Sequence, residues 1–161
     1  MSGSNIGKTI YISTALPATN DAAGFEALSW TKANGVQTLP QLGVSHSNID
    51  VPDLQSGFTA GVKGAGTGND SPMTFRQVDG DAGQTALRTA ADAGGDAGAL
   101  AIKIVLGSGT DNAPATGDPT EYAQGYAHSY IDNQGTDTTH EGFSANFKQN
   151  ALTIKAAHPT V

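Results

Sequence analysis

The residues that could carry chemistry in this sequence are four histidines, fifteen carboxylates and scattered serines. The histidines lack the H-x-x-x-H and H-E-x-x-H spacings that bring two zinc ligands onto one helix face. No serine occupies a G-x-S-x-G turn, and no base is paired locally with a nucleophile, so acyl transfer is not indicated. We therefore predict no metal site and no catalytic residue. The histidines are His46, His128, His140 and His158.

Other ligand-binding patterns are incomplete as well. Gly64, Gly66 and Gly68 miss the third glycine position of the dinucleotide fingerprint, and no phosphate-binding P-loop occurs. The acidic run from Asp132 to Asp137 lacks the twelve-residue spacing of a calcium loop. Aromatic residues make up only 6% of the chain, with Trp30 as the single tryptophan, which argues against a sugar-binding platform. The sequence therefore predicts no cofactor and no enzyme activity.

The chain is acidic, with a net charge of −7 and only eight lysines and arginines. These basic residues are scattered singly, so no patch is available to hold phosphate, and specific nucleic-acid binding is not expected. The acids gather between Gly107 and Gly142, where no lysine or arginine occurs. The absence of cysteine fits a reducing cytoplasm. The polar N-terminus and the lack of a run of ~18 apolar residues predict neither an export signal nor a membrane helix.

The supply of large apolar side chains is small. The length of 161 residues suits a single domain, yet Leu, Ile, Val and Phe account for only 29 of them. Glycine contributes 21 residues, which favours tight turns and extended segments. A core this thin indicates that burial is completed by partner chains, and self-assembly is the interpretation that follows.

Hydrophobic alternation predicts a mainly β fold. Period-two patterns predict strands over residues 8–13, 72–78, 99–106, 121–131 and 143–148, and a further short strand over 25–30. Residues 36–42 are interrupted by Pro40, and residues 152–155 extend toward the C-terminal arm. In the 121–131 strand, Tyr122, Tyr126, His128 and Tyr130 share one face, while Ala123, Gly125 and Ala127 form a small face open to close neighbours. The expected architecture is a single-domain β-sandwich or barrel.

One helix is expected beside this sheet, at about residues 81–94. Asp81 is placed to cap its N-terminus, Gln84 stands where a capping box requires it, and Gly94 follows its last turn. Residues 43–70 are predicted to form a projecting hairpin or loop, and its glycine-rich part from Gly61 to Asp70 is expected to be mobile. Residues 1–8 and 152–161 are expected to be extended arms.

The order of these segments resembles the major tail tube protein of long-tailed, siphovirus-type bacteriophages. The resemblance is carried by L-P-A-T-N-D-A-A-G-F-E-A-L at residues 16–28, by residues 47–54 with I-D-V-P-D-L, and by D-G-D-A-G-Q-T-A-L-R at 79–88 followed by the 99–106 strand. It covers most of the chain, and it is less clear beyond Thr110.

The resemblance implies a structural role. Six copies are expected to close into a ring by sheet extension, and the rings to stack into a hollow tube through which viral DNA passes without specific binding. The implied location is the virion tail, assembled in the cytoplasm of a bacterial host. Further implied partners are the tail tip or baseplate, the tape-measure protein and the tail terminator. Two other classes stay open, a β-sandwich adhesin or carbohydrate-binding module and a small hydrolase.

The resemblance also implies which residues meet neighbouring subunits. Contacts within and between rings are expected at apolar positions of the excursion and the two arms, namely Ile6, Val44, Ile49, Val51, Leu54, Phe58, Ile154 and Val161. Asp118, Glu121 and Asp132 are the acids expected to line the bore.

Overall fold

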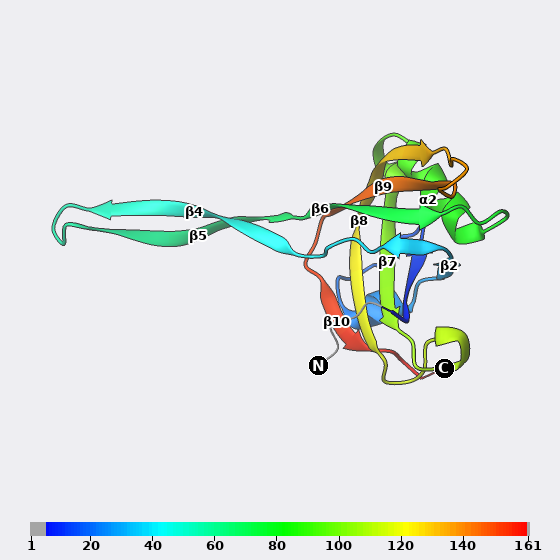
Figure 1. Ribbon diagram of the computed structural model, residues 1–161. Helices are drawn as coiled ribbons and strands as arrows, with labels where there is room; N and C mark the ends of the chain where they lie inside the picture. Colours follow the sequence, from blue (N-terminus) through cyan, green and yellow to red (C-terminus); the bar gives the residue numbers. More distant parts are fainter. Residues whose placement is uncertain (1–5, 161) are drawn as a thin grey trace.

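The computed structural model describes residues 6–160, in which the chain is mainly β (Figure 1). The strands are β1 Lys8–Ser13, β2 Thr31–Ala33, β3 Val36–Thr38, β4 Val44–Asp53, β5 Phe58–Gly68, β6 Asp70–Arg76, β7 Ala99–Leu106, β8 Pro119–Asn133, β9 Gly142–Gln149 and β10 Ile154–Ala157. The α-helices are α1 Ala22–Glu26 and α2 Ala82–Asp92, and two 3-10 turns lie at Gly95–Gly98 and Thr110–Asn112.

Eight strands within residues 6–160 form one antiparallel sheet. Its order is β2-β1-β7-β8-β9-β6-β3, and β10 pairs with β8 beyond the end of β9. The long strand β8 joins two wings of the sheet. Its first half pairs with β7 and belongs to the wing of β2, β1 and β7, and its second half pairs with β9 and belongs to the wing of β9, β6 and β3. The two ends of the sheet meet only through the turn at Asn34 and Gly35, so the sheet is not a closed barrel. The predicted mainly β sandwich with a flanking helix is confirmed, and the barrel alternative is not.

The core lies between the two wings and under α2. Alternate side chains of each strand point inward, as the period-two pattern predicts, and α2 adds its apolar stripe. Each fully buried large side chain of this kind contributes roughly 1.5–3 kcal/mol relative to an exposed one. The largest members of the cluster are Ile10, Ile12, Met73, Phe75, Leu87, Leu100, Ile102, Ile104, Phe143 and Phe147.

Helix α2 begins at the predicted cap. The carboxylate of Asp81 accepts a hydrogen bond from the backbone N–H of Gln84 at 2.9 Å. The Gln84 side chain does not return this bond, because its oxygen Oε1 accepts from the N–H of Val78 at 3.2 Å instead. Its amide nitrogen donates to the carbonyl oxygens of Asn34 and Arg76. It thereby ties the helix to the turn that joins β2 and β3. The helix ends at Asp92, two residues before the predicted limit.

The predicted strand over residues 25–30 is wrong, because this segment opens with α1. Asp21 caps the helix by accepting from the N–H of Gly24 at 2.8 Å. The short helix buries Phe25 against Tyr122, with ring centroids 5.2 Å apart, on the outer face of the wing formed by β1, β7 and β8. The indole N–H of Trp30 then donates to the carbonyl of Phe25 at 3.1 Å. A second apolar cluster therefore covers the outside of that wing.

A bulge in β8 alters the predicted faces of that strand. The register shifts between His128 and Ile131, and Ser129 has a φ of 57°. The shift turns Tyr130 toward the core, where its ring stacks on Phe143 at 5.0 Å. The four-residue aromatic face is therefore interrupted at Tyr130. The predicted small face is also not open to neighbours, because Ala123 and Ala127 are buried in the chain's own core.

The expected C-terminal arm is partly a strand of the body. Ile154 to Ala157 pair with β8 from Tyr122 to Pro119, and Ile154 packs against the outer cluster. The expected N-terminal arm ends at Lys8, which opens β1, and residues 1–5 lie outside the described part.

Candidate assembly surfaces

The excursion is a hairpin that stands away from the body. Strands β4 and β5 pair only with each other and form a separate two-stranded sheet (Figure 1). The turn between them is closed by the N–H of Gly57 donating to the carbonyl of Asp53 at 3.0 Å, and Gly57 takes a φ of 70° that favours glycine. The predicted projection is correct, but the glycine-rich part of Gly61–Asp70 forms most of the returning strand β5.

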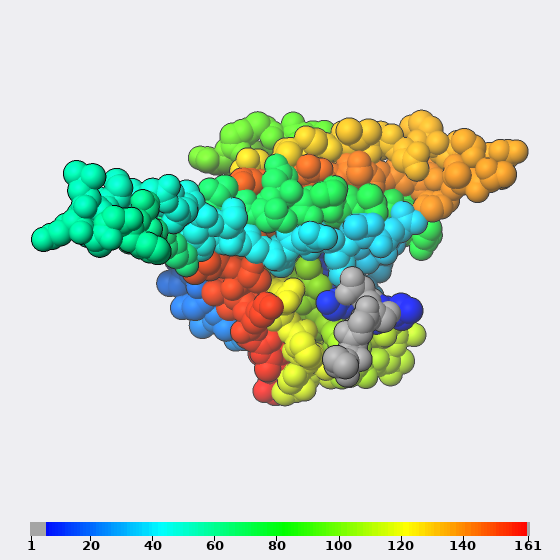
Figure 2. Space-filling model, turned by 60° about the vertical axis from the view of Figure 1, so that its left-hand side comes forward, coloured from blue at the N-terminus to red at the C-terminus, as the bar shows by residue number. Residues whose placement is uncertain are grey.

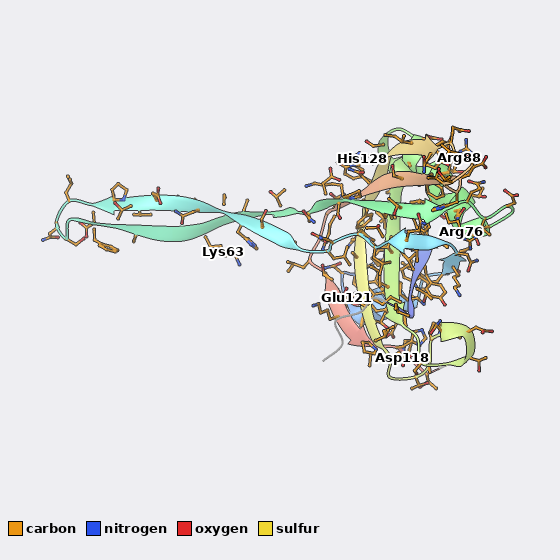
Figure 3. All side chains as sticks on the ribbon, viewed as in Figure 1. Lys63, Arg76, Arg88, Asp118, Glu121 and His128 are labelled. Carbon is orange, nitrogen blue, oxygen red and sulfur yellow. The ribbon has the colours of Figure 1, made fainter. Side chains whose placement is uncertain are left out.

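The hairpin has one apolar and one polar face. Cross-strand partners point to the same side, and the register pairs Ile49 with Val62 and Val51 with Ala60. Phe58 continues this face, and its side chain is 73% exposed. The opposite face is mainly polar, with Asn48 paired with Lys63, and with Asp50 and Thr59 on the same side. Figure 3 shows the side chains of the hairpin projecting free of the body, with Lys63 among them.

The base of the hairpin is held in a fixed direction. The N–H of Gly43 donates to the side-chain oxygen of Gln149 at 2.9 Å, and the N–H of Asn69 donates to the carbonyl of Gly43 at 2.9 Å. Gln149 is 1% exposed. A Cβ at Gly68 would lie 1.9 Å from the Gln149 carbonyl oxygen, so the close approach requires glycine there. The hairpin therefore leaves the body as a directed rod.

A polar chain that the sequence did not indicate lies beside this base. His128 Nε2 is 3.0 Å from the Asp70 carboxylate, and His128 Nδ1 is 2.7 Å from Ser129 Oγ. The hollow next to it is lined by α2, the turn at 95–98 and residues 126–128, but Ser129 does not line it. The geometry links β8 to the first residue of β6 and so supports the hairpin base. Figure 3 shows His128 on the body near this point.

The predicted contact residues fall on different kinds of surface. Ile49, Val51, Leu54 and Phe58 are all exposed on the hairpin, with Leu54 fully exposed at its turn. The remaining positions are less uniform: Ile6 is exposed, Val44 and Ile154 are half-buried, and Val161 lies outside the described residues. Their contacts with neighbouring subunits stay a prediction.

Asp118 is not placed like a lumen acid. Its side chain is buried and accepts from Ser108 Oγ at 2.6 Å, from the Ser108 N–H at 2.9 Å and from the Ala115 N–H at 2.7 Å. These hydrogen bonds, led by the Ser108 hydroxyl, hold the pKa of Asp118 below its ordinary value. The carboxylate fixes the loop between β7 and β8, which argues against a role as a free charge at a bore.

The other two predicted lumen acids lie at separate places. Glu121 pairs with Lys155 at 3.5 Å on neighbouring strands, a partly exposed contact of small energetic weight. Asp132 accepts a hydrogen bond from Tyr130 at 2.8 Å. Burial of the phenol is the main reason that the pKa of Tyr130 is raised to about 12. The three acids therefore do not form one cluster within the described chain.

Two further searches of residues 6–160 bear on function. No group of three or more His, Asp or Glu side chains is arranged to hold a metal ion in this part of the chain. None of its helices combines the length and the apolar character needed to cross a membrane.

Comparison with known proteins finds a likeness in fold. No family model matches the sequence, and no curated protein is significantly similar to it. Among solved structures, the SPP1 tail tube, determined by solid-state NMR and cryo-electron microscopy, matches with a TM-score of 0.61 over 94% of this chain and 77% of that chain. This chain has the tail tube fold. At 16% sequence identity the likeness concerns the fold, and it confirms at that level the resemblance noted in the sequence.

The tail tube match extends into the hairpin. The unmatched 6% of 161 residues is about ten residues, whereas the hairpin from 44 to 68 is longer. The projecting rod is therefore at least partly included in the likeness rather than being an insertion outside it.

Proposed function

We propose that this chain is the structural subunit of a phage tail tube, in which six copies form a ring and rings stack into a hollow tube that conducts viral DNA. The observation that carries the proposal is the tail tube fold over 94% of the chain. The uncovered apolar face of the hairpin supports it independently. The role is structural rather than enzymatic.

Stacking is assigned to the hairpin. A two-stranded ribbon is marginally stable in water, so the exposed apolar face of β4 and β5 calls for a partner surface. Figure 2 shows the hairpin (cyan to green) and the loop between β8 and β9 (orange) at opposite ends of the molecule. A subunit with such different ends suits head-to-tail contacts that repeat along an axis. Ile49, Val51, Leu54 and Phe58 are the central contacts.

Ring closure is assigned to the edges of the sheet. Within residues 6–160, β2, β3 and β10 each have one edge without a strand partner, and pairing with neighbouring copies would remove these edges. Val44, Ile154, Ile6 and Val161 are assigned to supporting contacts.

The charge of the ring suits the passage of DNA. Six copies of −7 each give −42 per ring, which disfavours phosphate binding in the bore. Glu121 and Asp132 remain the candidates to face the bore. DNA would pass without specific binding, in a virion tail assembled in the bacterial cytoplasm. The partners at the two ends of the tube and inside it would be the tail tip or baseplate, the tape-measure protein and the terminator protein.

The test is negative-stain electron microscopy of the purified chain at increasing concentration, combined with sedimentation velocity. Rings or hollow tubes of uniform width are the expected result. Monodisperse single copies at all concentrations, also after addition of a preformed tube fragment as a nucleus, would contradict the proposal.

A further inference from the structure

Lys103 is a largely buried cation that has no acidic partner among residues 6–160. It lies in the middle of β7, and its side chain is only 7% exposed. It forms no ion pair and no hydrogen bond through its side chain with any residue from 6 to 160. Burial of an ammonium group without a counter-charge is costly, and desolvation accordingly lowers the pKa of Lys103. This cation is therefore unpaired within residues 6–160, although the sequence contains fifteen acidic residues and eight basic ones.

Aromatic rings hold the ammonium group in place. The register puts Tyr11 of β1 directly across from Lys103, and Lys103 Nζ lies 4.5 Å from the centroid of the Tyr11 ring. The Trp30 ring lies 5.2 Å from Nζ on another side. That indole is itself fixed by its hydrogen bond to Phe25 and by its tilted contact with Tyr122 at 6.0 Å. The cation is therefore fixed by ring faces, which attract it but do not neutralise it.

The ammonium nitrogen is nevertheless not fully enclosed. Thr9 Oγ1 is the one fully enclosed side-chain nitrogen or oxygen without a hydrogen-bond partner within residues 6–160, and Lys103 Nζ, which also lacks such a partner, is therefore in part uncovered. No carboxylate of residues 6–160 lies within ion-pair distance of Lys103 Nζ. The described part of the chain thus offers this ammonium no counter-charge of its own.

The site lies two strands in from one end of the sheet. Trp30 precedes β2, which is the strand at one end of the sheet. Lys32 of β2 is the partner of Tyr11 on the side away from β7, so that Lys32, Tyr11 and Lys103 lie side by side across three strands. We infer that Lys103, between Tyr11 and Trp30, binds a carboxylate of a second copy of this chain. Charge complementarity favours that occupant, because each copy carries an excess of seven acids. The inference rests on the proposed function and names one polar contact within the assembly.

Zero-length cross-linking tests the contact without altering the protein. Subunits labelled with nitrogen-14 and nitrogen-15 are mixed, assembled and treated with a carbodiimide, which joins an amine to a carboxylate only when the two touch. Mass spectrometry of the digest is expected to find Lys103 linked to an aspartate or glutamate of the other isotope. Lys103 that is unlinked, or linked only to an acid of its own copy, would overturn the inference.

A substitution supplies the quantitative arm. Lys103→Met keeps the stem and removes the charge, so it should leave the thermal midpoint of single copies unchanged or raised, while the concentration needed for assembly rises at least about tenfold. Lys32→Met, in the same row but less buried, is the matched control and should assemble like the wild type. Equal assembly of the folded Lys103→Met variant and the wild type would overturn the inference and leave the proposed function standing. A wild type that never assembles would overturn both.

Discussion

The body buries most of its large apolar side chains, whereas the hairpin exposes them to solvent. All nineteen buried hydrophobic residues within residues 6–160 lie in the body, and none lies between residues 44 and 68. The hairpin instead exposes Ile49, Val51, Phe58 and Val62 by about half or more of their surface. The few large apolar side chains of the sequence are therefore divided between a core that the chain buries itself and a surface that a partner would have to cover. Substitutions in the two regions should therefore have separable effects.

The largest effect is expected from a charge on the apolar face of the hairpin. Val51→Asp places a carboxylate where a neighbouring subunit is proposed to pack, so tube formation should be abolished because the charge would have to be buried unpaired. The control is Thr59→Asp, which adds the same charge on the polar face. Electron microscopy should show tubes for the control alone, while both thermal midpoints stay within about 2 °C of the wild type because both positions are exposed. Normal tubes from Val51→Asp would show that the apolar face of the hairpin is not buried in the assembly.

A core truncation should give the second largest effect, and on folding instead of assembly. Phe147→Ala removes a ring that is 1% exposed between the wings, and it should lower the free energy of unfolding by about 3–5 kcal/mol. Phe58→Ala, the matched change in the hairpin, should cost less than about 0.5 kcal/mol in single copies. Urea denaturation measures both values. Similar losses for the two variants would show that the hairpin belongs to the cooperative core.

Asp118 should give a smaller effect that depends on pH. Its pKa is lower in the folded state, so its stabilisation is present above the unfolded pKa of about 3.9 and is lost as pH falls through the folded value. The difference in thermal midpoint between the wild type and Asp118→Asn should therefore be present at neutral pH and shrink in acid. Asp132→Asn, a change at an exposed acid, should show a smaller difference at neutral pH. A difference for Asp118→Asn that grows in acid would contradict the assignment of Asp118 to the loop.

The smallest effect is expected at the junction of the two regions. Ser129, His128 and Asp70 are in hydrogen-bonding contact, but we assign them to support of the hairpin base rather than to catalysis. A fluorophosphonate probe should label Ser129 no more than other exposed serines, and Ser129→Ala should not change the background hydrolysis of p-nitrophenyl acetate. Selective labelling of Ser129 that is lost in His128→Gln would instead reveal an activated nucleophile.

Elements governed by local pattern were predictable from the sequence. The limits of β1 and β7 agree with the predicted strands. β1 alternates apolar and polar positions, and β7 is a short apolar run in which Leu or Ile recurs at every second position before Gly107. Helix α2 was placed by its Asp81 cap. The projecting excursion followed from prolines and glycines that interrupt a weakly apolar stretch, and the structure shows that stretch as the hairpin.

Features that depend on distant contacts were not predictable. Helix α1 is five residues long and is held by Phe25 packing on Tyr122, nearly a hundred positions later in the sequence. Strand β5 contains glycines where an alternating pattern would require side chains, so the sequence predicted a mobile loop there instead of a strand. The contact between His128 and Asp70 joins residues 58 positions apart, and no spacing rule indicates it. Asp118 looked like a free acid because its donors at Ser108 and Ala115 are supplied by the folded loop.

Burial of the hairpin in the assembly can be measured by hydrogen exchange of the hairpin and the body, in single copies and in assembled material. Amides of β7 and β9 should be protected in both samples because they lie inside the sheet. Amides of β4 and β5 should exchange rapidly in single copies and become protected on assembly. Hairpin amides that exchange equally fast in assembled material would contradict the claim that this surface is covered by a neighbouring copy.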